Sequence, residues 1–326
     1  MSRDLRRLLV CPACRRGDLA GLSDLTGESD DAKLTCTACG EVYEVHGGVP
    51  ILVPPGADPH SGRDELDHLH AHKRRQAAHF DHAVAEEFET VRPHGTPPAH
   101  RWLLGHKLAR ATSGLPRLRG ATVVDACCGS GMEAEWLARN GARVLAVDLS
   151  EGAARRAQAR ARRFGLDYVV VVGDVERLPI RTGGADVAFV HDGLHHLSDP
   201  IGGVRELARV AGRAVSITEP ADAALTQVAV RLGLAANQED AGNKVRRLRP
   251  EQVTAELESA GFAARAERYL MYYGHEPGRP ARLLSRPLLY PAFKAGFGAA
   301  DRLAGRWGNK LCVTGVRPGD GPRRER

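Results

Sequence analysis

The chain is poor in aromatic residues, in lysine and in long apolar runs. Phe, Trp and Tyr make up 5% of the 326 residues, and six lysines stand beside 40 arginines. No stretch approaches the roughly 18 consecutive apolar residues that a membrane-spanning helix requires. The first residues are not followed by the apolar core of a secretory signal either. We therefore expect a cytoplasmic protein without a transmembrane segment.

The remaining composition is that of an ordinary globular protein. Hydrophobic residues account for 43% of the chain and charged residues for 26%, which excludes the disordered and fibrous classes. The length predicts one large domain with appendages, or two domains. The net charge of +6 permits a polyanionic partner such as nucleic acid without requiring one, because a solvated basic surface is the simpler explanation.

Composition divides the chain into four segments. Residues 1–54 contain four of the seven cysteines and end in an apolar run. Residues 55–117 begin as a linker rich in proline and continue as a polar segment with helical spacing. Residues 118–318 alternate short β-branched runs with helical stretches, which predicts βαβ units around a parallel sheet. The tail, 319–326, is predicted to be disordered.

This alternation predicts seven strands and four helices in the third segment. The predicted strands are Thr122–Asp125, Arg143–Asp148, Tyr168–Gly173, Val187–His191, Ala214–Thr218, Ala264–Tyr269 and Lys310–Val316. The predicted helices are Glu133–Asn140, Glu151–Phe164, Val204–Val210 and Pro250–Ser259.

Four cysteines form two Cys-x-x-Cys pairs near the N-terminus. Cys11 and Cys14 are separated from Cys36 and Cys39 by 21 residues, a spacing that sets four thiolates around one tetrahedral Zn²⁺. Gly40 suits the left-handed backbone that such turns use. Two disulfides are the alternative, which a reducing compartment disfavours. Four thiolates leave no open position for water, so the predicted zinc site is structural.

Residues 8–53 resemble the short zinc-ribbon family typified by the tRNA-methyltransferase activator subunit. The resemblance rests on the two cysteine pairs and on the segment 40–52 that follows them. It implies a small N-terminal zinc-ribbon domain. Free-standing eukaryotic members of the family bind and stabilise methyltransferases, so the resemblance also implies a supporting role toward an enzyme.

A glycine-rich turn follows the first predicted strand of the sheet. Gly129 and Gly131 lie where this strand turns into a helix, so the backbone can approach a charged ligand at the helix N-terminus. Asp148 ends the next strand and is placed to bind a ribose diol. Asp174 ends the third strand, where it can meet an adenine amino group. Together with Asp125, these acids predict a nucleotide site at the carboxyl edge of the sheet.

The stretch Asp125–Asp199 resembles the class I S-adenosylmethionine-dependent methyltransferases in the order of its motifs. The resemblance implies an α/β fold with a Rossmann-like, mostly parallel sheet of seven strands, and S-adenosylmethionine as the methyl donor. The cofactor contacts that it implies are the loop residues Asp125, Cys127, Gly129 and Gly131, the ribose-side Asp148 and Leu149, the adenine-side Asp174 and Val175, and His191.

Cys127 departs from the family pattern, in which glycine is usual at this place. The backbone there must be negative in φ or slightly strained. Quinone-type methyltransferases carry a similar pattern with cysteine, so we do not expect Cys127 to abolish activity. An NAD(P) dehydrogenase is the structural alternative, but Cys127 and Asp174 fit that class poorly.

The loops after the fourth and fifth predicted strands carry the candidate catalytic residues. Methyl transfer is an in-line displacement, so alignment is the main task, and a base is needed when the acceptor is a hydroxyl. His195 is the favoured base, and His191 is a second candidate with a cofactor contact as its alternative. Glu219 orients the acceptor, holds a cation, or is a solvated loop acid.

Two segments outside these motifs are candidates for covering the site. Phe80-Asp81 resembles the N-terminal lid of the methyltransferases, and a plain amphipathic helix fits the same pattern. Tyr272–Asn309 interleaves apolar side chains with arginines and a lysine. Such a mix is typical of a substrate cover, of a patch that rests on an anionic membrane surface, or of core packing.

The motifs together predict a methyltransferase that acts on a hydroxyl of a small-molecule, glycan or glycolipid-type acceptor. The segment Trp307–Thr314 resembles methyltransferases from glycan and glycolipid gene clusters. An rRNA or tRNA methyltransferase that uses the zinc ribbon for RNA recognition is the alternative, because zinc ribbons precede the catalytic domain in some RNA-modifying members. Residues 155–163 also form a basic helix, although this helix is expected to lie away from the acceptor. A non-catalytic methyltransferase partner is the third hypothesis, which the three cofactor acids disfavour.

Overall fold

The protein was analysed as a computed structural model. The residues that it describes are 3–22, 32–54, 68–82, 86–222, 247–271 and 277–319. The predicted linker from residue 55 and most of the predicted tail lie outside these ranges, as do residues 272–276 of the segment 272–309.

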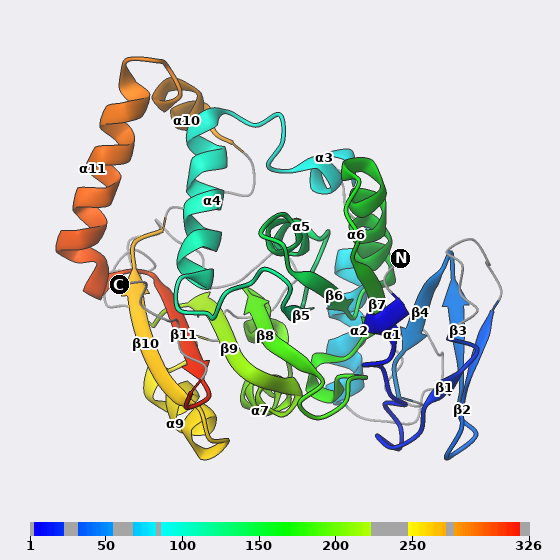
Figure 1. The fold of residues 1–326 in the computed structure, drawn as a ribbon. Coiled ribbons are helices and arrows are strands. Elements are labelled where there is room, and N and C mark those ends of the chain that lie inside the picture. The colour runs from blue at the N-terminus through cyan, green and yellow to red at the C-terminus, as the bar shows by residue number, and fades with distance from the viewer. Residues whose placement is uncertain are drawn as a thin grey trace.

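One eleven-stranded sheet runs through the described part of the chain, in the order β1-β2-β3-β4-β7-β6-β5-β8-β9-β11-β10 (Figure 1). The N-terminal strands are β1 (Leu19–Ala20), β2 (Lys33–Cys36), β3 (Val42–His46) and β4 (Val49–Leu52). The others are β5 (Thr122–Ala126), β6 (Arg143–Asp148), β7 (Val169–Gly173), β8 (Ala185–His191), β9 (Ala211–Pro220), β10 (Ala263–Tyr269) and β11 (Lys310–Val316).

Strands β5 to β11 are the seven predicted ones, each within a few residues of its expected bounds. Strands β5 to β9 pair in parallel, and β11 lies antiparallel between β9 and β10. The mostly parallel, seven-stranded α/β fold of the class I methyltransferases is therefore confirmed. Every residue of β5 and of β7 is buried, as expected of parallel strands that are covered on both faces.

Helices cover both faces of this sheet. Residues of α4, α5 and α6 share one hydrophobic cluster, and residues of α7 and α9 share another. The longer helices are α2 (His68–Asp81), α4 (Pro98–Thr112), α5 (Met132–Arg139), α6 (Glu151–Phe164), α7 (Pro200–Val210), α9 (Pro250–Ser259) and α11 (Leu289–Ala304). Shorter ones are α1 (Arg3–Arg6), α3 (Glu86–Val91), α10 (Arg279–Leu284), η2 (Val175–Arg177), η3 (Leu194–His196) and η4 (Gly305–Trp307).

Local sequence explains where the central helices begin and end. Ser150 caps α6 by accepting a hydrogen bond from the Ala153 N–H, and Gly165 ends the same helix in the left-handed conformation. Asp199 caps α7 through the Gly202 N–H, and proline occupies the first turn of this helix. The bounds of α6 and α9 are those that the sequence predicts.

The N-terminal unit joins the central sheet, which the sequence did not indicate. Strand β4 pairs in parallel with β7, with Ile51 opposite Val172 and Leu52 opposite Gly173. The outer edge of β7 would otherwise leave a row of backbone groups unpaired. One hydrophobic cluster contains Leu52 together with Val171 of β7. The apolar run at 49–53 thus extends the sheet rather than merely closing the N-terminal unit.

None of the helices in the described ranges is both long and apolar enough to cross a membrane. The segment with helical spacing that follows the predicted linker contains α2, α3 and α4, and residues 83–85 between α2 and α3 lie outside the described ranges.

Candidate functional site

The carboxyl ends of the parallel strands bring three aspartates to one edge of the sheet. Asp125 lies near the end of β5, Asp148 ends β6, and Asp174 follows β7. Strands β5 and β7 both flank β6 in register. The sequence-predicted acids therefore come from three neighbouring strands and share one rim.

The glycine-rich loop after β5 has a left-handed backbone at three positions. Cys127, Gly129 and Gly131 have φ values of 54°, 51° and 79°. A Cβ atom at Gly131 would lie 2.7 Å from the Tyr168 hydroxyl, so only glycine fits there. A Cβ at Gly129 would meet nothing within 4 Å, which indicates open space beside this backbone. The sequence predicted either a negative φ or a slightly strained backbone at Cys127. The second holds, because this non-glycine residue adopts a positive φ.

The Asp148 carboxylate is held by backbone donors. Its Oδ2 accepts a hydrogen bond from the Gly129 N–H at 2.8 Å, and its Oδ1 accepts one from the Ser150 N–H at 2.9 Å. Burial raises the pKa of Asp148, and these two N–H groups pull it partly back. Each oxygen retains a second lone pair for a ligand hydroxyl. Leu149 beside it is partly buried against the core.

Asp125 is a buried carboxyl whose hydrogen-bonding capacity the described residues do not satisfy. Its side chain is fully buried, and neither carboxylate oxygen has a hydrogen-bond partner among the described residues. Burial, with the nearby Glu133 and Asp148 carboxylates, raises the pKa of Asp125 well above its usual range. A buried, unpaired carboxyl of this kind indicates a place for a ligand that donates hydrogen bonds or carries positive charge.

Asp174 already holds a cation from the N-terminal segment. Its Oδ2 accepts a hydrogen bond from Lys73 Nζ of α2 at 2.5 Å, and Oδ1 accepts one from the Glu176 N–H. Lys73 also lies 2.6 Å from Glu176 Oε2. Burial lowers the pKa of Lys73, but attraction to Asp174 and Glu176 outweighs burial and raises it. Val175 is buried in the first turn of η2.

His195 and Glu219 form a buried pair. His195 Nδ1 lies 2.6 Å from Glu219 Oε2, and both side chains are almost fully buried. The other oxygen of Glu219 accepts the N–H groups of Gly193 and Leu194 at 2.9 and 2.7 Å. With the carboxylate as acceptor, the proton of the neutral ring sits on Nδ1 and the lone pair on Nε2.

The burial of Glu219 excludes one of the three sequence-based hypotheses for it. Its side chain has no exposed surface, so it is not a solvated loop acid. All its described hydrogen bonds go to His195 and to the backbone of the same loop. Glu219 therefore fixes the orientation of the His195 ring.

His191 is buried at the end of β8 beside a cluster of charges. Neither ring nitrogen has a hydrogen-bond partner among the described residues. Burial, helped by the nearby Lys107 ammonium, lowers the pKa of His191 well below its usual range. The next residue, Asp192, has a φ of 54° and ion pairs with Lys310 and, at 3.6 Å, with Lys107 of α4. His191 is thus a neutral side chain at this rim.

The four N-terminal cysteines converge on one point. Their Sγ atoms all lie within 4.8 Å of one another, with 3.7 Å between Cys11 and Cys39 and 3.6 Å between Cys14 and Cys36. Zinc–sulfur bonds of about 2.3 Å in a tetrahedron require sulfurs about 3.8 Å apart. Backbone N–H groups also point at the sulfurs of Cys14 and Cys36, as suits thiolates. The donor set fits zinc.

Arg177 connects the cysteine cluster to the strand-end site. It is the last residue of η2, the short helix that begins directly after Asp174. Arg177 donates hydrogen bonds to the carbonyl oxygens of Pro12 and Ala13, both at 2.5 Å. These carbonyls belong to the two residues between Cys11 and Cys14. The turn that carries the first cysteine pair is therefore tied to the turn that follows Asp174.

The predicted lid residues hold α2 against α6. Asp81 Oδ1 accepts hydrogen bonds from the Ser150 hydroxyl and the Gly152 N–H, and Arg156 donates to the carbonyl oxygens of Phe80 and Asp81. The Phe80 ring lies edge-on to His196, with centroids 5.4 Å apart. Helix α2 therefore covers the loops that follow β6 and β8.

The sequence motifs assign no role in the site to Lys73, Lys107, Arg177 or Lys310. A signal for three of them exists in the composition, because lysine is rare in this arginine-rich chain. Of the six lysines, Lys73, Lys107 and Lys310 are buried at the strand ends. Nothing comparable marks Arg177 among 40 arginines.

Residues 124–214 match the protein family described as "Methyltransferase domain". The match begins in β5, with the residue before Asp125, and ends within β9. It thus includes all three strand-end acids, the glycine-rich loop and His195, and it ends before Glu219.

Among curated proteins, the chain is similar to two kinds of methyltransferase. It is 34% identical over 91 residues to the demethylmenaquinone methyltransferase of Beutenbergia cavernae, which covers 28% of this chain and 36% of that protein. It is 35% identical over 99 residues to the ubiquinone biosynthesis O-methyltransferase of Methylocella silvestris, covering 28% and 39%. The chain therefore spans less than half the length of these relatives.

Among solved structures, two remote likenesses concern methyltransferases. Magnesium protoporphyrin IX methyltransferase from Synechocystis, solved with bound S-adenosylmethionine, has a TM-score of 0.48 at 16% identity, over 78% of this chain and 99% of that chain. A Haloferax volcanii complex containing the Trm112 methyltransferase activator has a TM-score of 0.46 at 19% identity, over 72% and 98%.

The substitution Asp125→Asn should change how stability depends on pH. Because burial raises the pKa of Asp125, the folded state holds its proton more tightly than the unfolded state. The free energy of unfolding therefore falls as the pH rises above about 4, by about 1.4 kcal/mol for each pH unit over which only the folded state is protonated. In urea unfolding without ligand, we expect the free energy of unfolding of the variant to rise relative to that of the wild type from pH 5 to pH 8.

The exposed Asp167 provides the control for this measurement. Asp167→Asn should leave the pH dependence of the wild type unchanged. Parallel stability curves for Asp125→Asn and the wild type across the pH range would contradict the assignment of a buried, protonated carboxyl.

Proposed function

We propose that this protein is an S-adenosylmethionine-dependent methyltransferase that methylates a hydroxyl group of a small-molecule acceptor. One observation carries the proposal: the strand-end acids surround a glycine-rich loop, and a buried His195–Glu219 pair lies at the ends of the adjoining strands β8 and β9. The matched methyltransferase family at 124–214 supports the same class of activity.

The unsatisfied groups at the strand ends fit the parts of this cofactor. S-adenosylmethionine supplies a methyl group activated by a sulfonium. Asp148 has lone pairs for the ribose diol beside the open backbone at Gly129. The buried Asp125 carboxyl offers an acceptor for the ammonium of the methionine part. Val175 and Leu149 provide apolar contacts for the base, next to the Asp174–Lys73 ion pair.

His195 is the proposed general base. The Glu219 carboxylate fixes the ring through Nδ1, so Nε2 is the nitrogen that takes a proton from the acceptor hydroxyl. The imidazolium that results is stabilised by the same carboxylate at 2.6 Å. His191, buried and neutral, is better suited to contacting the cofactor than to moving a proton.

The acceptor class rests on the base and on the relatives. A base is required for a hydroxyl acceptor, and the matched relatives include proteins named as O-methyltransferases and quinone methyltransferases. We infer a hydroxylated acceptor of the small-molecule, glycan or glycolipid type. The named relatives match over 28% of this chain, so they support the reaction more strongly than the acceptor.

The basis for the RNA methyltransferase alternative is weakened by the placement of the arginines in α6. Arg160 is fully buried and donates to Glu135 and to two backbone carbonyls, and Arg156 is buried against α2. These two arginines therefore take part in internal packing and are not available to phosphates. A non-catalytic role would leave the acids and the His195–Glu219 pair unexplained.

We also propose that the N-terminal unit is a zinc ribbon that holds one structural Zn²⁺ through Cys11, Cys14, Cys36 and Cys39. Its role here is to support the methyltransferase unit of the same chain. The support runs through the β4–β7 pairing and through Arg177.

The cofactor assignment predicts tight dependence on Asp148. Isothermal titration calorimetry with S-adenosylmethionine should show binding by the wild type, and Asp148→Ala should weaken it by about tenfold to a hundredfold, because a charged acceptor for two hydroxyls is lost. The exposed Asp167→Ala variant is the matched control and should bind like the wild type. Equal affinity for Asp148→Ala would sink the assignment.

The base assignment predicts a separation between binding and turnover. His195→Ala should lower methyl transfer from radiolabelled S-adenosylmethionine to a small-molecule extract by about 10²- to 10⁴-fold, while cofactor affinity changes little. Glu219→Gln should lower turnover less and shift its pH profile. The exposed His79 serves as control, since His79→Ala removes an imidazole elsewhere. Full turnover by His195→Ala at every pH would exclude the base role.

The zinc assignment predicts one zinc per chain in protein purified without chelator. Elemental analysis of Cys36→Ser should show that most of the zinc is lost. Thermal unfolding should show a lower unfolding temperature for the whole chain, because β4 and Arg177 join the N-terminal unit to the central sheet. Cys312→Ser, which alters a cysteine outside the cluster, should keep its zinc. Wild-type protein with well under one zinc per chain would rule out the site.

A further inference from the structure

The segment 279–307 forms a helical hairpin of α10, α11 and η4 that lies at the opposite end of the molecule from β1–β3 (Figure 1). We call it the α10–α11 hairpin. One side packs on α4, where the Trp102 ring lies 5.5 Å from the rings of Phe293 and Phe297. The Ala99 N–H of α4 also donates to the Ser285 hydroxyl at 2.9 Å.

The opposite side of the hairpin is apolar and uncovered. No residue of α11 is buried. Leu288 and Leu303 have 91% and 79% of their surfaces exposed, and the exposed Ala292 and Ala299 lie between them. Positions 288, 292, 299 and 303 share one face of a helix. Leucines exposed to this extent on a continuous helical face indicate an unfilled contact.

The charges of the hairpin have nearly one sign. Residues 279–307 contain six basic residues and one acid, a net charge of +5, whereas the whole chain carries +6. The one acid, Asp301, faces inward, because it accepts the Leu270 N–H and ion pairs with Arg110 of α4 at 3.4 Å. The outward charge is therefore basic. Its residues are Arg279, Arg282, Arg286, Lys294, Arg302 and Arg306.

We propose that the α10–α11 hairpin docks the protein on the surface of a lipid bilayer that contains anionic headgroups. Exposed leucines gain free energy by entering an apolar phase, and flanking basic side chains reach the phosphates while their stems stay buried. Trp307, half exposed with Arg306 stacked 3.8 Å from its ring, is suited to the boundary between the two.

Nucleic acid fits this surface less well. Single-stranded binding sites present aromatic rings for base stacking along a basic groove. Here the phenylalanines of α11 are turned toward Trp102, and the exposed face consists of leucine and alanine. A charged phosphate backbone offers nothing to these alkyl groups.

Docking through this hairpin would bring α4 close to the lipid surface. Helix α4 carries Lys107, which reaches Asp192 at the rim of the strand-end site. An acceptor dissolved in or anchored to the bilayer would then lie near that rim. The docking itself does not depend on the proposed methyltransferase activity, so the two can fail separately.

Vesicle sedimentation with the full chain tests the proposal. The probes are vesicles of phosphatidylcholine alone and of phosphatidylcholine with 30% phosphatidylglycerol. We expect binding to the anionic vesicles that weakens with salt, and at least tenfold weaker binding to the neutral ones. Each basic residue close to such a surface contributes about 1 kcal/mol, roughly fivefold. Arg282→Glu with Arg286→Glu should therefore reduce binding at least 25-fold.

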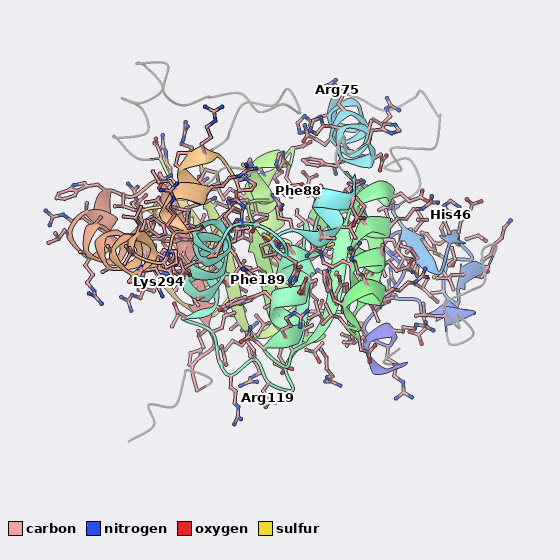
Figure 2. All side chains as sticks on the ribbon, turned by 90° about the horizontal axis from the view of Figure 1, so that it is seen from above. His46, Arg75, Phe88, Arg119, Phe189 and Lys294 are labelled. Atoms are coloured by element: carbon pink, nitrogen blue, oxygen red, sulfur yellow. The ribbon has the colours of Figure 1, made fainter. Side chains whose placement is uncertain are left out.

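The variant Leu288→Glu with Leu303→Glu should reduce binding to anionic vesicles at least tenfold. Val42→Glu is the matched control, because Val42 is 48% exposed in the same strand as His46, which Figure 2 shows at the far end from Lys294. It should bind like the wild type. Circular dichroism and cofactor calorimetry should be unchanged in all these variants, since the substituted side chains are exposed.

Three results would overturn the proposal. One is the absence of sedimentation with anionic vesicles. Another is undiminished binding by the leucine variant. The third is a wild-type dimer in analytical ultracentrifugation that the leucine variant converts to a monomer, or a gel shift with tRNA, in either case without vesicle binding. These would assign the face to a second copy of the chain or to nucleic acid.

Discussion

Parallel pairing of β5 with β6 and β8, and of β6 with β7, is the constraint on which the site depends. Parallel strands end on the same edge of a sheet, so chemistry placed at strand ends is gathered there without further design. Asp125, Asp148 and Asp174 meet for this reason, and the turn after β8 and the end of β9 add His195 and Glu219 to the same rim.

The same sheet makes the N-terminal unit a structural part of the unit that carries the strand-end site. A free-standing ribbon would expose an edge, and β7 would expose another; pairing β4 with β7 removes both. Leu52 lies opposite Gly173, one residue before Asp174. Arg177, three residues after Asp174, donates hydrogen bonds to the turn that carries the first cysteine pair. The cysteine cluster and the turn at Asp174 are thereby connected through contacts that involve only a few residues.

Buried charge around the rim is matched group by group. Lys73 is paired with Asp174 and Glu176, Arg160 with Glu135, and Asp192 with Lys107 and Lys310. Against this background the unpartnered Asp125 is conspicuous. A buried polar group without a hydrogen-bond partner is costly, so its persistence fits a partner supplied by a ligand. The α10–α11 hairpin differs, because its six basic residues and one acid leave it a net charge of +5.

Periodicity and spacing in the sequence by themselves determined the seven strands, the bounds of α6 and α9, the three acids and the grouping of four cysteines, because these depend on local patterns and on the ordering of βαβ units. The tertiary structure alone decided that Glu219 serves His195, that Lys73 reaches Asp174, that Arg156 and Arg160 turn inward, and that β4 joins β7. Each of these contacts joins residues from 24 to over 100 positions apart, and no local pattern encodes which distant partner a charged side chain or an open strand edge will meet.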